Sequence, residues 1–212
     1  MRRLPVYLLI DVSGSMYGEP IEAVKNGLQL LISALRKEPQ ALETAYISLI
    51  TFSDKVNQSV PLTEIASFQP PNLSAGGGTS LGAALSEVTK VANKEVTKGT
   101  ADEKGDWKPL VFMMTDGVPT DSVEKGLSEF KNGKWGIVVA CAAGHGADTK
   151  LLQRITENVV VLDTCDSTTI SAFFRWVSSS VSVSSKRVES GTQVDNLNEL
   201  PPPPPEISLL KL

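Results

Sequence analysis

Three oxygen-bearing side chains follow an apolar run near the start of the chain, in the segment LLIDVSGSM (residues 8–16). Asp11, Ser13 and Ser15 occupy every second position, and in an extended chain such positions project to the same side. Gly14 lets the chain bend tightly there. One carboxylate and two hydroxyls around a single point, with no imidazole or thiolate, suit Mg²⁺, Mn²⁺ or Ca²⁺ and disfavour zinc or copper. The same residue types are also common at helix N-caps, so this segment alone does not settle its role.

Two further segments carry ligands of the same kind. In SAGGGTSLG (residues 74–82) three glycines precede Thr79, and in MMTDGVPTD (residues 113–121) an apolar run ends in Asp116. The glycines permit close approach of the backbone, Thr79 adds a hydroxyl and Asp116 adds a second carboxylate. Asp11 and Asp116 both end apolar runs, and ligands of open α/β sheets bind at the carboxyl ends of the strands. We therefore predict one oxygen cluster built from Asp11, Ser13, Ser15, Thr79 and Asp116.

Apolar runs alternate with amphipathic segments along the chain, which predicts an α/β fold. Pro61 places the strand over 58–65 at an edge of the sheet. We expect a Rossmann-like arrangement with a central, mostly parallel sheet, one antiparallel edge strand and helices on both faces. Strands are expected over 6–11, 44–52, 58–65, 109–116, 134–144 and 158–163, and helices over 18–37, 80–97, 121–131, 147–157 and 167–182.

The composition fits one globular domain. The chain has 212 residues, of which 41% are hydrophobic, and a formal net charge of −4. No basic cluster favours nucleic acid, and the apolar runs are shorter than the roughly 18–20 residues of a membrane span. The N-terminal segment MRRLPVYLLI lacks a cleavage site, so export is not expected. Two cysteines fit a reducing compartment, and we expect a cytoplasmic protein.

The composition changes near residue 185, so we divide the chain into a domain over 1–184 and a tail over 185–212. Five prolines at 201–205 favour an extended polyproline spacer. The final segment, EISLLKL, suits a short strand that docks on the domain or on a partner. A flexible tail fits the same residues, and the sequence leaves both alternatives open.

The segments DVSGS, GGGTS and TDG, in this order, resemble the von Willebrand factor A domain and its metal-ion-dependent adhesion site. The resemblance covers roughly residues 4–182, and all five ligand positions match. Further segments, LPVYLLIDVSGSMYGEPIEAVKNG and SLITFSD, resemble the bacterial TerY-like group associated with tellurium resistance. Some members of that group carry an added zinc-binding segment, which this chain lacks.

The resemblance implies a non-enzymatic, metal-dependent protein-interaction module. Asp11, Ser13, Ser15, Thr79 and Asp116 then hold Mg²⁺ or Mn²⁺, with Ca²⁺ less favoured, directly or through water. A partner protein presents an Asp or Glu to the metal. The resemblance also implies partners from a bacterial tellurite or stress-resistance operon, such as kinase-like or phosphatase-like proteins, and no nucleic acid or membrane.

Two other interpretations stay open. Asp11 follows a strand as the nucleophile of a metal-dependent phosphohydrolase does, although Ser13 stands where that site has a second acid. Alternatively, the metal site is vestigial and the chain is a scaffold that binds through its tail. Nucleotide binding is disfavoured because no lysine follows the glycines of residues 76–78. A serine hydrolase is disfavoured because His145 is the only histidine and the nucleophile elbow is absent.

Overall fold

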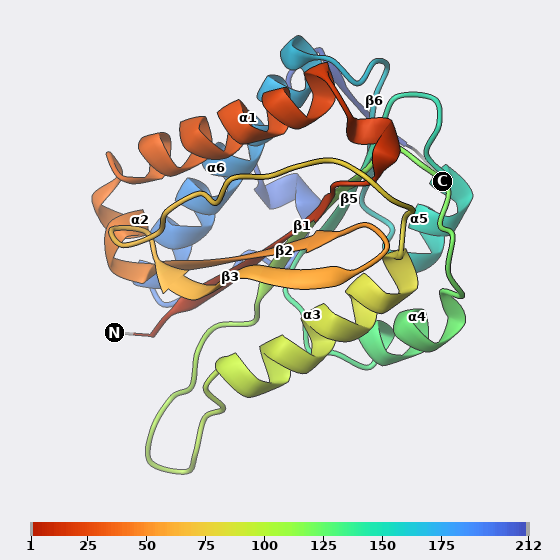
Figure 1. The fold of residues 1–212 in the computed structure, drawn as a ribbon. Helices are drawn as coiled ribbons and strands as arrows, with labels where there is room; N and C mark the ends of the chain where they lie inside the picture. Colours follow the sequence, from red (N-terminus) through yellow and green to blue (C-terminus); the bar gives the residue numbers. More distant parts are fainter. Residues whose placement is uncertain (1, 211–212) are drawn as a thin grey trace.

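Seven strands form the central layer of the computed structural model, which describes residues 2–210 (Figure 1). Across the sheet the strands follow the order β3-β2-β1-β4-β5-β6-β7. The crossover from β2 to β4 around β1 is the doubly wound pattern expected of alternating strands and helices. The strands are β1 (Leu4–Asp11), β2 (Ala45–Phe52), β3 (Val56–Glu64), β4 (Leu110–Thr115), β5 (Val138–Ala143), β6 (Val159–Leu162) and β7 (Ile207–Leu209).

The five inner strands are parallel, and an antiparallel strand closes each edge. β1 pairs with β2 and β4, and the parallel pairing continues through β5 to β6. β3 lies antiparallel to β2, which confirms the predicted edge strand. The prediction of a single antiparallel edge strand was incomplete, because β7 pairs antiparallel with β6 at the other edge.

Helices cover both faces of the sheet, as the sequence predicted. β1 is buried along its whole length, and its side chains alternate between two apolar clusters. Leu8 and Ile10 pack in the cluster beneath α1 and α6, whereas Tyr7 and Leu9 pack in the cluster beneath α3 and α4. The helices are α1 (Glu19–Leu35), α2 (Pro39–Thr44), α3 (Leu81–Glu95), α4 (Glu124–Lys131), α5 (Thr149–Ile155) and α6 (Ser167–Glu189), with 3-10 turns at Gly14–Met16 (η1) and Leu197–Glu199 (η2).

The structure corrects three predicted boundaries. α6 extends to Glu189 instead of ending near 182, because its serine-rich second half packs against α1 and α2. The predicted division at 184/185 therefore falls inside a helix. β5 begins at Val138 rather than at 134, and the short helix α2 was not predicted. No helix among residues 2–210 combines the length and the apolar character needed to cross a bilayer.

The chain after α6 packs back onto the domain, so the docked alternative for the C-terminal segment is the one that the structure adopts. The indole Nε1 of Trp176 donates a hydrogen bond to the carbonyl of Pro201 (2.8 Å). Val194 is fully buried, and Ile207 is 4% exposed where it pairs with Leu162. Residues 190–210 thus contribute to the core and to the sheet.

The longest excursion from the body is the segment between α3 and β4, residues 96–109, which we call the α3–β4 loop. Figure 1 shows it projecting from the end of α3, on the side where β1 begins. The loop precedes β4, so it leaves the sheet at the amino ends of the parallel strands. The segments containing Asp11 and Asp116 follow the carboxyl ends of β1 and β4, at the opposite edge.

Asp166 caps α6, and its replacement tests how firmly that helix is anchored. The carboxylate accepts hydrogen bonds from Thr164 Oγ1, Thr168 N and Thr169 N. These hydrogen bonds lower the pKa of Asp166, and the bond from Thr164 has the largest effect. The Asp166 carboxylate therefore stabilises the folded state fully above the ordinary Asp pKa of about 4. This stabilisation is lost as the pH falls through the lowered pKa of the folded state.

We expect Asp166→Ala to reduce the free energy of unfolding by about 1 kcal/mol at neutral pH. The deficit should shrink as the pH falls from about 4 through the lowered pKa of the native carboxyl, because that carboxyl becomes protonated only over this lower range. Urea denaturation at several pH values measures both quantities. Asp166→Asn is the matched control, since asparagine caps helices well without a titrating group. A deficit that does not change with pH would contradict the role of the charge.

Ile207→Ala tests the docking of β7. Ile207 is almost fully buried, so its truncation should cost about 2 kcal/mol, near the lower end for a core Ile because the site lies at the sheet edge. Ser208→Ala, next to it on the exposed face, should change the free energy of unfolding by less than about 0.5 kcal/mol. Equal effects of the two substitutions in urea denaturation would show that the segment does not contribute to the core.

Candidate metal centre

Asp11 is the last residue of β1, and its carboxylate is fully buried with both oxygens engaged. Oδ1 accepts a hydrogen bond from the backbone N–H of Ser13 (2.8 Å), and Oδ2 accepts one from Thr115 Oγ1 (2.5 Å). Parallel pairing of β1 with β4, which sets Ile10 opposite Met114, places Asp11 beside Thr115. The sheet register therefore fixes the carboxylate at the base of the cluster.

A chain of hydrogen bonds links the two serines to the second carboxylate. Ser13 Oγ and Ser15 Oγ lie 3.0 Å apart, and Ser15 Oγ donates to Asp116 Oδ1 (2.7 Å). The prediction that these positions lie along an extended chain was wrong for Ser15. Ser13 is extended, but residues 14–16 form the 3-10 turn η1, which folds the second hydroxyl back onto the first. The turn, rather than strand periodicity, gathers the oxygens.

Thr79 lies on the glycine-rich segment (residues 74–82), two positions before the first residue of α3, and is 5% exposed. A Cβ built on Gly117, next to Asp116, would lie 3.5 Å from Thr79 Oγ1 and 3.9 Å from Ser15 Oγ. These two hydroxyls therefore flank the same small space beside Asp116. The structure brings together all five residues that the sequence singled out.

Two glycines permit the close contact between these segments. Gly14 N donates to Gly77 O (2.9 Å), and a Cβ on Gly14 would lie 3.3 Å from that carbonyl oxygen. Gly14 does not have a positive φ, so its role is close approach rather than the sharp bend that the sequence suggested. Gly77 does adopt a positive φ of 81°, a conformation that glycine takes without strain.

Burial raises the pKa of both carboxyl groups of the cluster. For Asp11 the hydrogen bonds from Ser13 and Thr115 offset part of this effect, and for Asp116 the hydrogen bond from Ser15 does so. No ion pair with a Lys, Arg or His of residues 2–210 compensates either carboxylate. Two uncompensated carboxylates surrounded by hydroxyls match the oxygen ligands and the charge that a divalent cation such as Mg²⁺ requires.

The five residues of the cluster include no thiol or imidazole. Burial and the neighbouring carboxylates of Asp116 and Asp11 raise the pKa of the Cys165 thiol to about 12, so it is protonated at neutral pH. Within the described part of the chain, no group of three or more His, Cys, Asp or Glu side chains is placed to hold a metal ion. The cluster therefore consists of hydroxyls and two carboxylates, and their role as metal ligands stays a prediction.

Four further residues support the cluster, and the sequence analysis did not assign them. Thr115 orients Asp11, as described above. Asp54 Oδ1 accepts from Gly78 N (2.7 Å), and Thr120 Oγ1 accepts from Thr79 N (2.9 Å). The Asp121 carboxylate accepts from two backbone N–H groups at the start of α3. For Thr115, Thr120 and Asp121 the polar run TDGVPTD was the available signal, but which of its side chains face the glycine-rich segment depends on the folded loops.

Two of the four exposed large hydrophobic residues in the described chain lie next to cluster residues. Tyr17 is 80% exposed and follows η1, and Val118 is 60% exposed and follows Asp116 by two positions. Met16, the residue before Tyr17, is fully buried in the core. His145 is exposed in the loop after β5. An apolar, solvent-facing border thus lies beside the oxygen cluster.

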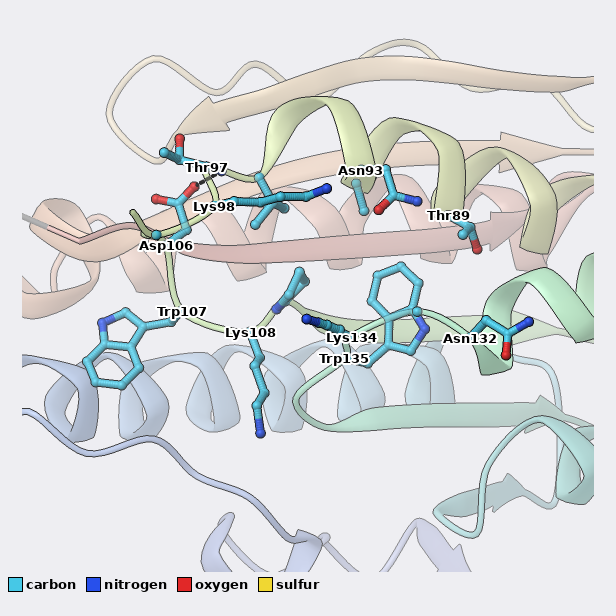
Figure 2. A pocket seen from close by; sticks show the side chains of 15 residues that line it. Thr89, Asn93, Thr97, Lys98, Asp106, Trp107, Lys108, Asn132, Lys134 and Trp135 are labelled. Atoms are coloured by element: carbon cyan, nitrogen blue, oxygen red, sulfur yellow. Dashed lines mark hydrogen bonds between the residues drawn. The ribbon is translucent and has the colours of Figure 1, made fainter. Parts of the chain in front are cut away.

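A separate cavity of about 520 Å³ lies at the opposite edge, at the base of the α3–β4 loop. Figure 2 shows Lys98, Lys134 and Trp135 around it, with Asp106 turned toward the backbone of Thr97. The cavity lies before β4 and Asp116 lies after it, so the six residues of this strand, or about 20 Å, separate the cavity from the oxygen cluster. The cavity therefore takes no part in the oxygen cluster.

The fold and the cluster agree with the comparison to known families. The model of the von Willebrand factor type A domain matches residues 6–176, which is most of the chain. The chain belongs to this family. The human inter-alpha-trypsin inhibitor heavy chain H6 is 27% identical to this A domain over 168 residues, or 71% of the chain. The match spans only 12% of that relative's own length.

Solved structures confirm the A-domain fold. Proximal thread matrix protein 1 from the mussel byssus, in a structure described as having a zinc-occupied MIDAS motif, superposes with a TM-score of 0.60 at 19% identity. The pilus adhesin SpaC from Lactobacillus rhamnosus GG superposes with a TM-score of 0.64 at 16% identity. The matches cover 84% and 86% of this chain, but only 48% and 30% of the mussel and bacterial chains.

Thr115→Val tests the support of Asp11. The substitution keeps the shape of the side chain but removes its hydrogen bond to a fully buried carboxylate. We expect Mg²⁺ affinity, measured by calorimetry, to fall about 10–100-fold, as is typical when a group that orients a metal ligand is lost.

Thr44→Val is the matched control for this experiment. Thr44 is also a buried threonine, but its hydroxyl bonds to the Gln40 carbonyl in α2, far from the cluster along the sheet. Its replacement should leave Mg²⁺ affinity unchanged. Equal loss of affinity in the two variants would mean that general destabilisation, rather than the orientation of Asp11, is responsible.

Proposed function

We propose that this A domain is a metal-dependent protein-interaction module in which Asp11, Ser13, Ser15, Thr79 and Asp116 hold Mg²⁺ or Mn²⁺. One observation carries the proposal. Three loops bring two carboxylates and three hydroxyls together, and no cationic side chain of the described residues neutralises the carboxylates. When bound, the metal supplies an electrophilic position at which a carboxylate of a partner protein acts as a ligand.

The cluster residues make two kinds of contribution to the proposed binding of the metal. Asp11 and Asp116 supply negative charge, while Ser13, Ser15 and Thr79 supply neutral oxygens. A donor set with two carboxylates balances a divalent charge without exceeding it, which leaves an affinity for a further anionic ligand. Ser15 is exposed and Asp116 is half-buried, so the cluster opens to solvent on their side. Tyr17 and Val118 border that opening and offer apolar contacts to a partner.

The occupied metal site described for the mussel thread matrix protein supports divalent-cation binding by this fold. That protein was occupied by zinc. We infer Mg²⁺ or Mn²⁺ for this chain because its donors are all hard oxygens. The adhesin and matrix descriptions of the structural neighbours likewise favour an interaction role over catalysis.

The phosphohydrolase alternative has less support. A nucleophilic carboxylate needs an accessible oxygen, but Asp11 has no exposed surface and both oxygens accept hydrogen bonds. The scaffold alternative needs a free tail, but residues 190–210 pack on the domain through Val194 and Ile207. We therefore place the interaction at the oxygen cluster and propose that the chain is not an enzyme.

The more specific expectations rest on the TerY-like resemblance alone. They are a bacterial, cytoplasmic protein, a tellurite or stress-resistance system, and kinase-like or phosphatase-like partners. Neither the family match nor the structural neighbours bear on them, and they stay predictions.

Titration with Mg²⁺ and Mn²⁺ tests the proposal. We expect calorimetry to show one saturable site in the native chain and none in Asp11→Ala. At a metal concentration of 100 times Kd, binding should add about 2.7 kcal/mol to the free energy of unfolding and raise Tm by several degrees. Asp163→Ala is the control, because this exposed aspartate follows β6 at the same edge but lies outside the cluster. Equal binding by native protein and Asp11→Ala would refute the assignment.

A further inference from the structure

The oxygen cluster restricts the shape of any partner that reaches it. Asp11 has no exposed surface, and Ser13 and Thr79 are only 2% and 5% exposed, so the cluster is reached only from the side of Ser15 and Asp116. A carboxylate on a flat protein surface is poorly suited to approach such a recessed centre. A carboxylate on a projecting loop is well suited, provided that its oxygens are not already paired.

We propose that one such partner is a second copy of this chain, whose α3–β4 loop presents Asp102 and Glu103 to the metal centre of its neighbour. This inference rests on the proposed function, because it supplies the partner carboxylate that the metal centre requires. It names the donor, the surface that carries it and the symmetry of the resulting assembly.

The α3–β4 loop has the shape that the recessed cluster needs. It projects from the body beyond the end of α3 (Figure 1), and residues 97–104 are exposed. The carboxylates of Asp102 and Glu103 form no hydrogen bond or ion pair with residues 2–210. They therefore remain available as ligands.

Acidic residues beside the cluster are less available. Most of them hold backbone N–H groups of their own domain and would have to break those bonds to bind a neighbour's metal. Those engaged in this way are Glu19, Asp54, Asp121, Asp148 and Asp166. A symmetric dimer in which the two metal edges face each other is therefore disfavoured.

The α3–β4 loop is braced at its base and at its tip, which lowers the entropic cost of presenting it. Arg3 binds the Asp106 carboxylate through two hydrogen bonds (2.6 and 3.0 Å), and the same carboxylate accepts from Thr97 N (2.7 Å; Figure 2). At the tip, Thr100 N donates to the Glu103 carbonyl (2.8 Å), and Glu103 N donates to Thr100 Oγ1 (3.1 Å). The backbone that carries Asp102 and Glu103 is thus held in a tight turn.

The edge that carries the oxygen cluster is acidic, whereas the α3–β4 loop has as many lysines as acids. The loops that follow the carboxyl ends of the parallel strands carry six aspartates but only one lysine. On the α3–β4 loop, Lys98 and Lys104 flank the two acids, and neither lysine pairs with another described residue. A carboxylate with basic neighbours suits a metal with acidic surroundings, because the lysines offset repulsion between the two edges. The aspartates are Asp54, Asp116, Asp121, Asp148, Asp163 and Asp166, and the lysine is Lys55.

The positions of loop and cluster determine the symmetry. β4 lies between them and spans about 20 Å, so the α3–β4 loop does not reach the metal centre of its own chain. Each copy then offers one donor at one edge and one acceptor at the other. Such a head-to-tail contact is heterologous and builds a ring or an open filament rather than a closed dimer.

Sedimentation velocity over a range of protein concentrations tests the proposal. In millimolar Mg²⁺ the native chain should form species above 22.7 kDa, and EDTA should return it to the monomer. Asp11→Ala has an intact loop without a metal centre, and the double variant Asp102→Asn/Glu103→Gln has a metal centre without a donor. Each alone should stay monomeric. Their mixture should form a dimer and no larger species, because only one productive contact is available.

Glu157→Gln is the matched control, since this exposed acid lies at the same edge as the α3–β4 loop but on the body of the domain. It should associate like the native chain. Lys98→Gln/Lys104→Gln should weaken association at low salt by several fold and reduce its dependence on salt. Association that persists in Asp102→Asn/Glu103→Gln would overturn the assignment of the loop.

Calorimetry separates failure of this inference from failure of the proposed function. If the native chain binds Mg²⁺ but remains monomeric at the highest concentration, the second copy is not the partner and the metal-dependent function stands. If the native chain binds no Mg²⁺ and does not associate, the proposed function fails and this inference fails with it. If Asp11→Ala and Asp102→Asn/Glu103→Gln form a dimer only when mixed, the proposed function and this inference are both supported.

Discussion

The structure depends on two carboxylates that lie at one edge of the parallel sheet and that no cationic side chain of residues 2–210 neutralises. Asp11 ends β1 and Asp116 follows the adjacent strand β4, and the β1–β4 register brings them to the same place. Their charge is balanced within the described protein only by hydrogen bonds from hydroxyls and backbone N–H groups. Such bonds recover part of the cost of burial, and a divalent cation would recover the remainder. Metal binding as proposed would therefore be coupled to folding through the same few oxygens.

Bonds between the loops hold the cluster in shape independently of its ligand oxygens. Two backbone hydrogen bonds join the segment around η1 to the glycine-rich segment at residues 76–78. Gly14 N donates to Gly77 O, and Gly76 N donates to Val12 O. The glycine segment is joined to the β4–α4 loop through Thr79 and Thr120. A geometry fixed by backbone groups costs little reorganisation when a ligand arrives. The ligand side chains are thus free to exchange their own hydrogen bonds for a metal.

The sequence predicted the features that have local causes. The fully apolar run of β1 and the helical spacing in α1 indicate buried strand and amphipathic helix wherever they occur, and both were found. The five oxygen-bearing residues of the cluster were recognisable because each lies beside a strand end or a glycine run. Thr115 was not singled out, since its role depends on which side of β4 faces Asp11. Asp54 was missed because its bond to Gly78 spans 24 residues of sequence.

The C-terminal part was also harder to predict, because its structure depends on contacts between residues that are far apart in the sequence. The second half of α6 is rich in serine and valine, which are weak helix formers, and only packing against α1 and α2 extends it to Glu189. Docking of the last strand depends on a free place beside β6, which no local pattern reveals. The turn η1 was also missed, because residues of the types in SGSM occur in extended and turned backbone alike.

The strand β7 has a consequence for the solubility of the chain. β6 consists of Val-Val-Val-Leu, a short apolar segment with high strand propensity, and β7 occupies its outer edge. Proteolytic removal of residues 190–210 would leave that edge with unpaired backbone groups, next to a core surface that Val194 and Ile207 no longer cover. Exposed edges of this composition recruit strands from other molecules. We would then expect a clipped chain to aggregate more readily than the intact one, because β7 covers the edge of β6 in the folded domain.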